Sequence, residues 1–305
     1  MEPQNTVPAP VVPAPLLSAP LIGPISLWRY AWGKYRANWK PLTTIILLPY
    51  AATYIGLGLM AIETLPFTIL GGLVMFVGVV LTMAAYVGLM DASVKLGSDV
   101  PLPHLTDQYR TGFKLFWGFV LLGIIQYAVM AGSLVLFIIP AVIVSIYTSF
   151  AFVAYVADGK KSISAFTESF AAVRGRWWKT LGRILFLVLV HIAVMLIIVG
   201  IRFLASLLFG YKFGSGPDVI VGTLLQVVVA LVLIPVVILY VTKLYQSLKE
   251  TRADLPTKTF KNWLVAFIVI GVLAIISLPV VMGTVIKAQL DAKAQLDAGV
   301  GLENK

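Results

Sequence analysis

The sequence predicts an all-α fold, a polytopic transmembrane helical bundle of about seven spans. Hydrophobic residues make up 60% of the chain and charged residues only 12%, whereas a soluble domain carries about a quarter charged residues. The charged residues gather in short segments between long uncharged stretches, which is typical of membrane loops. The net charge of +10 is therefore a property of loops, and we expect no nucleic-acid partner.

The sequence divides into three regions. Residues 1–24 hold seven of the 17 prolines and no lysine or arginine, so we expect a disordered Pro/Ala-rich cytoplasmic tail and no secretory signal peptide. Residues 25–286 form the transmembrane helical domain. Residues 287–305 form a polar C-terminal tail.

The first four spans follow from length and the absence of charge. A helix needs about 20 apolar residues to cross a hydrocarbon core of about 30 Å. Residues 42–62 and 66–90 are uncharged and qualify as the first hairpin. Residues 115–157 carry no charge over 43 residues. At about 1.5 Å per residue this stretch is far too long for one crossing, so we predict two spans with a break between Gly132 and Pro140.

Three further spans cover residues 184–208, 219–242 and 263–286. In the second span we expect Gly71, Gly72 and Gly78 to permit close contact with a neighbouring helix.

The distribution of lysine and arginine predicts the orientation. With seven spans, 18 basic residues fall on the side of the N-terminus and five on the other side. The five are Arg202, Lys212, Lys287, Lys293 and Lys305. By the positive-inside rule we predict a cytoplasmic N-terminus and an external C-terminus in a bacterial cytoplasmic (inner) membrane.

Two segments directly before spans one and five carry apolar residues in steps of three and four, which places each set on one helical face. The sets are Ile25, Trp28, Trp32, Tyr35 and Trp39, and Ile163, Phe166, Phe170, Val173 and Trp177. They align at a constant offset of 138 residues, and a poorer third copy precedes span three at Leu102, Leu105, Tyr109, Phe113 and Phe116. We predict a threefold repeat of a cytoplasmic interfacial amphipathic helix and a two-span hairpin, with the seventh span appended.

Aromatic and basic residues in these segments predict contact with the membrane interface, with rings at headgroup level and cations toward anionic lipid phosphates. For residues 162–178 we expect the apolar face to lie in the headgroup boundary. The alternative interpretation is a docking surface for a protein partner, or a gate. The candidate interface residues are Trp28, Trp32, Trp39, Arg174, Arg176, Trp177, Trp178 and Lys179.

Several short signatures resemble a known family. They are residues 149–168 (SFAFVAYVADGKKSISAFTE), residues 174–183 (RGRWWKTLGR), and the opening residues 27–32 (LWRYAW) and 38–40 (NWK). Over residues 22–250 the chain resembles the bacterial family built around the membrane domain of glycerophosphoryl diester phosphodiesterase and related multi-pass proteins of unknown function. The resemblance implies a multi-helix membrane domain with no known activity of its own. Members with phosphodiesterase activity carry a separate soluble barrel with metal ligands, which this chain has no room for, so we do not expect that activity.

A candidate midplane polar site contains His191 and Gln126. His191 lies about ten residues into span five, where an ionisable group indicates a proton relay or a substrate contact. The interpretation that we favour is a neutral imidazole that is hydrogen-bonded to a neighbouring helix through Gln126 of span three. At the span ends we expect Arg202 to reach the outer headgroups and Asp91 to pair with Lys95.

The sequence offers no catalytic, cofactor-binding or metal-binding constellation. It has no Walker-type glycine loop, HExxH helix or GxSxG elbow, and the absence of cysteine excludes thiolate chemistry. We therefore predict a non-enzymatic membrane domain that organises lipid or protein partners, with anionic membrane lipids foremost. The alternative is a transporter or channel with a midplane cavity near His191. A polar cavity lined by several spans would favour this alternative, and a dry bundle would favour the scaffold.

The predicted topology can be tested with reporter fusions. Fusions after Lys95, Lys161 and Arg252 should report a cytoplasmic location, and a fusion after Lys293 an external one, because of the bias in basic residues. A cytoplasmic signal after Lys293 would rule out seven full spans.

Overall fold

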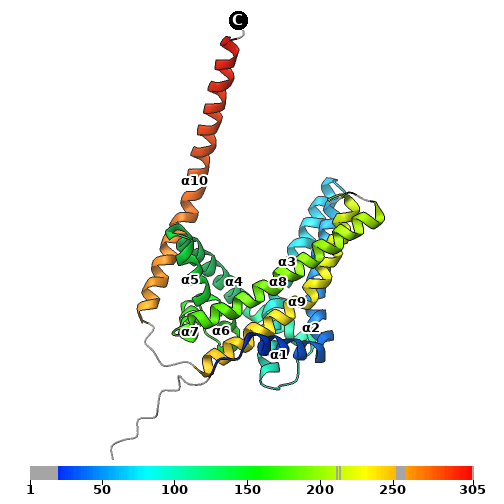
Figure 1. Cartoon of the computed structure of the whole chain (residues 1–305), viewed down its shortest axis with the longest axis vertical. Helices are drawn as coiled ribbons and strands as arrows, with labels where there is room; N and C mark the ends of the chain where they lie inside the picture. The colour runs from blue at the N-terminus through cyan, green and yellow to red at the C-terminus, as the bar shows by residue number, and fades with distance from the viewer. Residues whose placement is uncertain (1–19, 211, 213, 252–257, 304–305) are drawn as a thin grey trace, which may run out of the picture.

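The computed structural model describes residues 20–210, 212, 214–251 and 258–303 (Figure 1). Within these ranges the chain forms α-helices and no strand, and seven helical segments are long and apolar enough to cross a membrane. The predicted all-α polytopic bundle is therefore confirmed. The helices are α1 (Pro24–Ala37), α2 (Trp39–Met60), α3 (Leu65–Gly97), α4 (Leu105–Leu136), α5 (Ile138–Thr148), α6 (Ala151–Asp158), α7 (Ile163–Val173), α8 (Trp177–Phe209), α9 (Gly216–Glu250) and α10 (Lys258–Glu303).

The predicted break between spans three and four is confirmed. Helix α4 ends at Leu136 and α5 begins at Ile138, with Phe137 between them at a φ of 134°. Span four consists of two helices in series, α5 and α6. The break between these two helices was not predicted from the sequence. The seventh helix, α10, also runs beyond the predicted end at residue 286, so the described part of the polar C-terminal tail is helical.

The break between α5 and α6 is closed by a side chain from α7. The Ser169 hydroxyl donates to the Tyr147 carbonyl oxygen at 2.7 Å and accepts from the Phe150 N–H at 3.1 Å. These are backbone groups that an uninterrupted helix would satisfy internally. Ser169 is fully buried, so α7 is part of the bundle and not only attached to its surface.

The described parts of the segments predicted to be cytoplasmic meet at one end of the molecule, which we call the basic end. Lys34 of α1 pairs with Asp99 after α3 at 2.7 Å, and Lys249 of α9 pairs with Asp158 of α6 at 2.6 Å. Arg183 of α8 donates to the carbonyl oxygens of Leu21 and Ile22 at 3.0 and 2.8 Å. The described chain is therefore ordered from before Pro24, where we expected tail. Residues 1–19 of that predicted tail lie outside the described residues.

From the basic end two groups of helices diverge (Figure 1). One group contains α2, α3, α8 and α9, and the other contains α4, α5 and α10. The large fully buried side chains lie mainly toward the basic end, where the two groups join. They include Leu27, Leu42, Ile45, Leu89, Phe150, Phe166, Tyr240 and Tyr245.

Glycines allow the helices to cross closely. A Cβ at Gly56 of α2 would lie 2.7 Å from the Gly71 carbonyl oxygen of α3, and one at Gly78 would lie 2.6 Å from the Thr53 hydroxyl. The contacts predicted for Gly71 and Gly78 are thus confirmed. The prediction for Gly72 was wrong, since a Cβ there would meet nothing within 4 Å.

The two predicted interfacial helices differ in which face they turn outward. In α1 most of the expected face is outward, because Ile25 and Trp32 are exposed, as is Trp39 at the start of α2. The opposite face of α1, with Leu27 and Ala31, is buried together with Tyr35. Small Ala31 lets this face lie close to its neighbours, among which α9 is the main one.

In α7 the expected headgroup face is packed inside the protein, so this prediction was wrong. Phe166 and Val173 are fully buried, and Phe170 stacks on Phe260 of α10 with 3.8 Å between ring centroids. The small residues Ala165 and Ala172 on the same side permit that packing.

Two copies of the predicted repeat are visible as α1 with α2 and α3, and as α7 with α8 and α9. The third copy lacks a separate first helix, because α4 runs without interruption from Leu105.

The crossing of α4 and α10 offers a stability test. A Cβ at Gly271 would overlap the Ala128 carbonyl oxygen of α4, so Gly271→Leu should force the two helices apart and destabilise the fold by about 1–3 kcal/mol or more. Gly72→Leu is the matched control, because that position faces open space. Thermal unfolding in detergent should show a clear decrease for the first variant and little change for the second. Equal unfolding temperatures would contradict the close crossing.

Candidate functional site

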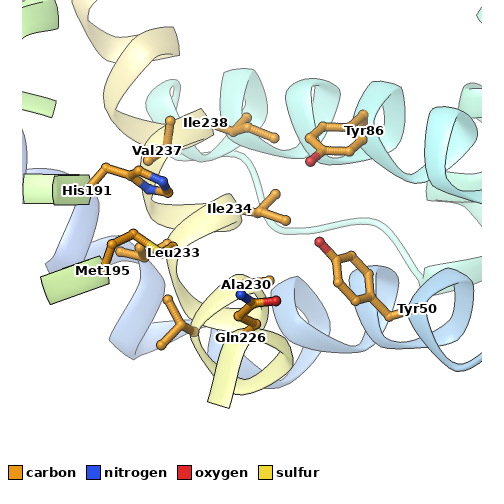
Figure 2. A pocket seen from close by; sticks show the side chains of 11 residues that line it. Tyr50, Tyr86, His191, Met195, Gln226, Ala230, Leu233, Ile234, Val237 and Ile238 are labelled. Atoms are coloured by element: carbon orange, nitrogen blue, oxygen red, sulfur yellow. The ribbon is translucent and has the colours of Figure 1, made fainter. Parts of the chain in front are cut away.

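A cavity of about 300 Å³ lies between α2, α3, α8 and α9, and we call it the midplane cavity (Figure 2). Four polar side chains line it, one from each helix: Tyr50, Tyr86, His191 and Gln226. The remaining wall is apolar and comes mainly from α9, with residues Val229, Ala230, Leu233, Ile234, Val237 and Ile238, and with Met195 from α8. The arrangement is that of a ligand pocket with a few polar groups in a hydrophobic wall.

The polar groups reach the cavity from different sides, and the His191 and Gln226 side chains are also exposed at the surface of the bundle. Figure 2 shows the Tyr50 and Tyr86 hydroxyls turned toward the same space beside Ile234, and the His191 imidazole turned toward α9. His191 and Tyr50 both lie near the middle of their helices, α8 and α2. A ligand here would thus sit well inside the bilayer.

None of these four polar side chains has a hydrogen-bond partner among the residues that the structure describes. This separates them from most other polar groups in the spans, such as the Thr53 and Thr82 hydroxyls, which donate to carbonyl oxygens of their own helices at 2.9 and 2.8 Å. An unsatisfied polar group in hydrocarbon costs several kcal/mol. Buried side-chain atoms without a partner also occur elsewhere in the described chain, in Gln108, Gln126, Thr180, Ser215 and Thr242. What distinguishes the midplane cavity is that four polar side chains converge on one space, which makes it the candidate ligand site.

A second hollow of about 610 Å³ adjoins the midplane cavity and shares Tyr50 and Tyr86 with it. Its other lining residues are Thr53, Tyr54, Leu57, Val79, Thr82, Met83 and Phe119. Since Phe119 belongs to α4, this hollow reaches the other group of helices. The two tyrosines therefore stand between two spaces in the membrane region.

Toward the basic end the cavity is closed by tight packing. Ile45 of α2, Leu89 of α3 and Leu239 of α9 each follow the cavity in that direction and are at most 1% exposed. In the opposite direction Leu57 and Leu224 are 46% and 61% exposed. Along α8 only Thr180 and Ile198 are buried, so the described chain packs least tightly around the cavity on these sides.

The predicted partnership of His191 with Gln126 was wrong. The Gln126 amide nitrogen donates to the Thr148 hydroxyl of α5 at 3.1 Å, which places it in the other group of helices. Sequence reasoning found His191 but missed Tyr50 and Tyr86. A tyrosine in the middle of a span, with an oxygen to satisfy in hydrocarbon, was the signal that could have found them.

Arg202 does not act as a free anchor for headgroups. Its guanidinium holds Asp218 of α9 in a two-point contact at 3.1 and 2.6 Å, and the Gly214 N–H donates to the same carboxylate at 2.8 Å. Asp218 is fully buried. This ion pair joins α8 to α9 beyond the cavity, on the side away from the basic end.

The other ion pairs of the described chain lie at the basic end. The predicted pair of Asp91 with Lys95 is confirmed at 2.6 Å. The hydrogen bond from Lys34 lowers the pKa of the Asp99 carboxyl and raises the pKa of the Lys34 ammonium. No group of three His, Asp or Glu side chains suited to a metal occurs in the described part of the chain.

The candidate interface residues fall into two separate sets. The first set lies on α1 and at the start of α2 and consists of Trp28, Trp32 and Trp39. The Trp28 and Phe186 rings pack edge to face, with 6.3 Å between their centroids. The second set lies around the start of α8: Arg174, Arg176, Trp177, Trp178 and Lys179. Trp178 is 77% exposed, and Arg176 donates to the Thr251 hydroxyl after α9.

Comparison with known proteins gives no relative: no family model, no curated protein and no solved structure matches this chain.

The tyrosine hydroxyls can be tested by removing them. Tyr50→Phe and Tyr86→Phe should leave stability unchanged or slightly higher, because each removes a hydroxyl with no protein partner among the described residues. Tyr109→Phe is the contrasting variant, since the Tyr109 hydroxyl donates to the Ile45 carbonyl oxygen at 2.6 Å. It should destabilise by about 1–3 kcal/mol in thermal unfolding. An equal loss of stability in all three variants would mean that the Tyr50 and Tyr86 hydroxyls do have partners within the protein.

Proposed function

We propose that this integral membrane protein is a non-enzymatic binding protein for a small neutral amphiphile, which it holds in the midplane cavity. The observation that carries the proposal is the convergence of four polar side chains from four helices on one space. Their donors and acceptors fit a molecule that is mostly hydrocarbon and carries one or two oxygen-containing groups. The apolar wall from α9 fits the rest of such a molecule.

The absence of formal charge in the lining supports a neutral ligand. Apart from two tyrosine phenols, His191 is the only ionisable side chain among the lining residues, and no lysine, arginine or carboxylate accompanies it. A charged ligand would lose its hydration without gaining an opposite charge. The same lack of paired acids and bases is why we propose binding and not catalysis.

The convergence on one cavity also favours the interpretation that the sequence placed second. A dry bundle would have supported a scaffold, whereas the open cavity supports ligand handling. A cavity that is tightly packed on the cytoplasmic side and less covered on the other side is expected of one state of an alternating-access carrier. Transport of the same amphiphile is therefore the second candidate function. The setting that we propose remains a bacterial inner membrane with the basic end in the cytoplasm, and the family resemblance remains a prediction.

Photolabelling can test the binding site. The full chain in lipid nanodiscs would be irradiated with a long-chain alcohol that carries a diazirine, and labelled peptides would be located by mass spectrometry. We expect labels next to Tyr50, Tyr86 and Met195. His191→Leu should reduce this labelling several-fold because it removes a hydrogen-bonding group, whereas His191→Gln should retain it.

His104→Leu provides the matched control, since His104 is exposed in the loop before α4, away from the cavity. Labelling spread evenly over the lipid-facing surfaces, and unchanged by His191→Leu, would refute the binding site. A measured flux that His191→Gln abolishes in a folded protein would instead make proton-coupled transport the better account.

A further inference from the structure

The hollow that adjoins the midplane cavity has a different kind of wall. Its volume is about 610 Å³, and four of its nine lining residues carry rings: Tyr50, Tyr54, Tyr86 and Phe119. We call it the aromatic hollow. The midplane cavity has only aliphatic and thioether side chains beside its four polar residues. Because Tyr50 and Tyr86 line both spaces, the two together offer a ligand an aromatic half and an aliphatic half.

Packing within the protein holds the rings of the aromatic hollow in place. The Tyr50 and Tyr54 rings lie one turn apart on α2, with 6.2 Å between their centroids. On α4 the Phe119 ring packs against Phe152 of α6, with 4.8 Å between centroids. A ring that already packs against a neighbour loses little further freedom when a ligand binds. The hollow therefore presents a preorganised surface to a flat molecule.

The hydrogen-bonding groups of the aromatic hollow lie mainly where it joins the midplane cavity. The Thr53 and Thr82 hydroxyls donate to carbonyl oxygens of their own helices, so the tyrosines are the donors that remain. Two of the three tyrosines, Tyr50 and Tyr86, stand at the join, and their hydroxyls turn toward the same space beside Ile234 (Figure 2). An oxygen of the ligand is therefore expected at the join.

The aliphatic half runs along α9. Its lining residues on that helix extend from Gln226 to Ile238, which is about 18 Å at about 1.5 Å per residue. A wall of this length fits an extended hydrocarbon chain. Gln226, at the end away from the basic end, is exposed, so a longer chain can continue into the surrounding lipid.

We infer that the ligand of this site is a lipid with a flat oxygen-bearing ring, as in isoprenoid quinones and 2-alkylphenols. The inference rests on the proposed function and specifies its amphiphile. The ring lies in the aromatic hollow, the oxygen beside the tail meets the Tyr50 and Tyr86 hydroxyls, and the tail follows α9. In both classes the carbon that bears an oxygen neighbours the carbon that bears the tail. Ring, oxygen and tail thus occur in the order in which the site offers their partners.

The aromatic lining separates this ligand class from a straight-chain alcohol or ester. A flat conjugated ring packs against protein rings in offset or edge-on arrangements, which a hydrocarbon chain cannot do. Quinones are uncharged, and a phenol with a pKa of about 10 is neutral at pH 7, which fits a lining without lysine, arginine or carboxylate. A straight chain would fill the aliphatic half alone and leave the aromatic hollow to bulk lipid.

Photolabelling of the full chain in lipid nanodiscs tests this inference. The probe is an alkyl benzoquinone with an azide on its ring, and labelled peptides are located by mass spectrometry. We expect labels next to Tyr54, Met83 and Phe119. An excess of unlabelled alkyl quinone or 2-alkylphenol should reduce labelling about tenfold more than a linear ketone with the same number of carbons, as expected for one ring contact. The stronger of these two competitors identifies the source of the ring.

Two leucine substitutions on α4 form a matched pair. Phe119→Leu removes a ring from the aromatic hollow and should lower azidoquinone labelling several-fold, without changing the labelling by a straight-chain alcohol probe in the midplane cavity. Phe113→Leu removes an exposed ring that lines neither space and should change neither. Thermal unfolding reports whether each variant is folded. If Phe119→Leu is not, Tyr54→Leu and Tyr54→Phe give the same comparison, because only the first removes a ring.

Azidoquinone labels spread evenly over the lipid-facing surfaces would overturn the ring-bearing ligand. Equal losses in Phe119→Leu and Phe113→Leu, or equal protection by the linear ketone, would do the same. In each of these cases a straight-chain probe that still labels the midplane cavity leaves the proposed function intact. Azidoquinone labels in the aromatic hollow without straight-chain labels in the cavity would support the ring-bearing ligand and refute binding of amphiphiles in general.

Discussion

The constraint on which this structure depends is that the bilayer core supplies no hydrogen-bond partners to the chain. Every interruption of a helix therefore has to be satisfied by the protein itself. Pro49 has no N–H, so the Ile45 carbonyl one turn earlier loses its partner, and the Tyr109 hydroxyl of α4 replaces it at 2.6 Å. Ser169 does the same for both sides of the break between α5 and α6. These repairs come from neighbouring helices, so they also fix how α2, α4, α5, α6 and α7 are arranged.

The same constraint gives meaning to the groups that are not satisfied. In water a tyrosine hydroxyl without a protein partner is unremarkable because solvent serves it, but in a span it is costly. Four polar side chains without a partner line one cavity: Tyr50, Tyr86, His191 and Gln226. By contrast, the buried Asp218 carboxylate accepts three hydrogen bonds. Because these four neutral groups converge on one space, they are the groups that the ligand proposed above would contact.

The sequence predicted the features that depend on length and periodicity, and missed those that depend on contacts between distant segments. Apolar length located all seven spans, and the basic loops do gather at one end. Periodicity identified α7 as amphipathic but not what its apolar face meets, because a lipid headgroup and the Phe260 ring of α10 favour the same side chains. Depth along a span suggested Gln126 as the partner of His191. The choice failed because equal depth does not place two helices side by side, and α4 and α8 belong to different groups.

The cavity wall is least supported along α8. Near its start, the Arg183 guanidinium donates to the carbonyl oxygens of Leu21 and Ile22, and the Arg183 carbonyl oxygen accepts from the Tyr240 hydroxyl at 3.1 Å. Near its end, α8 is attached to α9 by the ion pair of Arg202 with Asp218. His191 lies between these two attachments, in a stretch where few side chains are buried. Local opening occurs most easily where buried contacts are fewest. For the amphiphile that we propose, we therefore expect entry on the side of the cavity that carries His191, because the basic end is tightly packed.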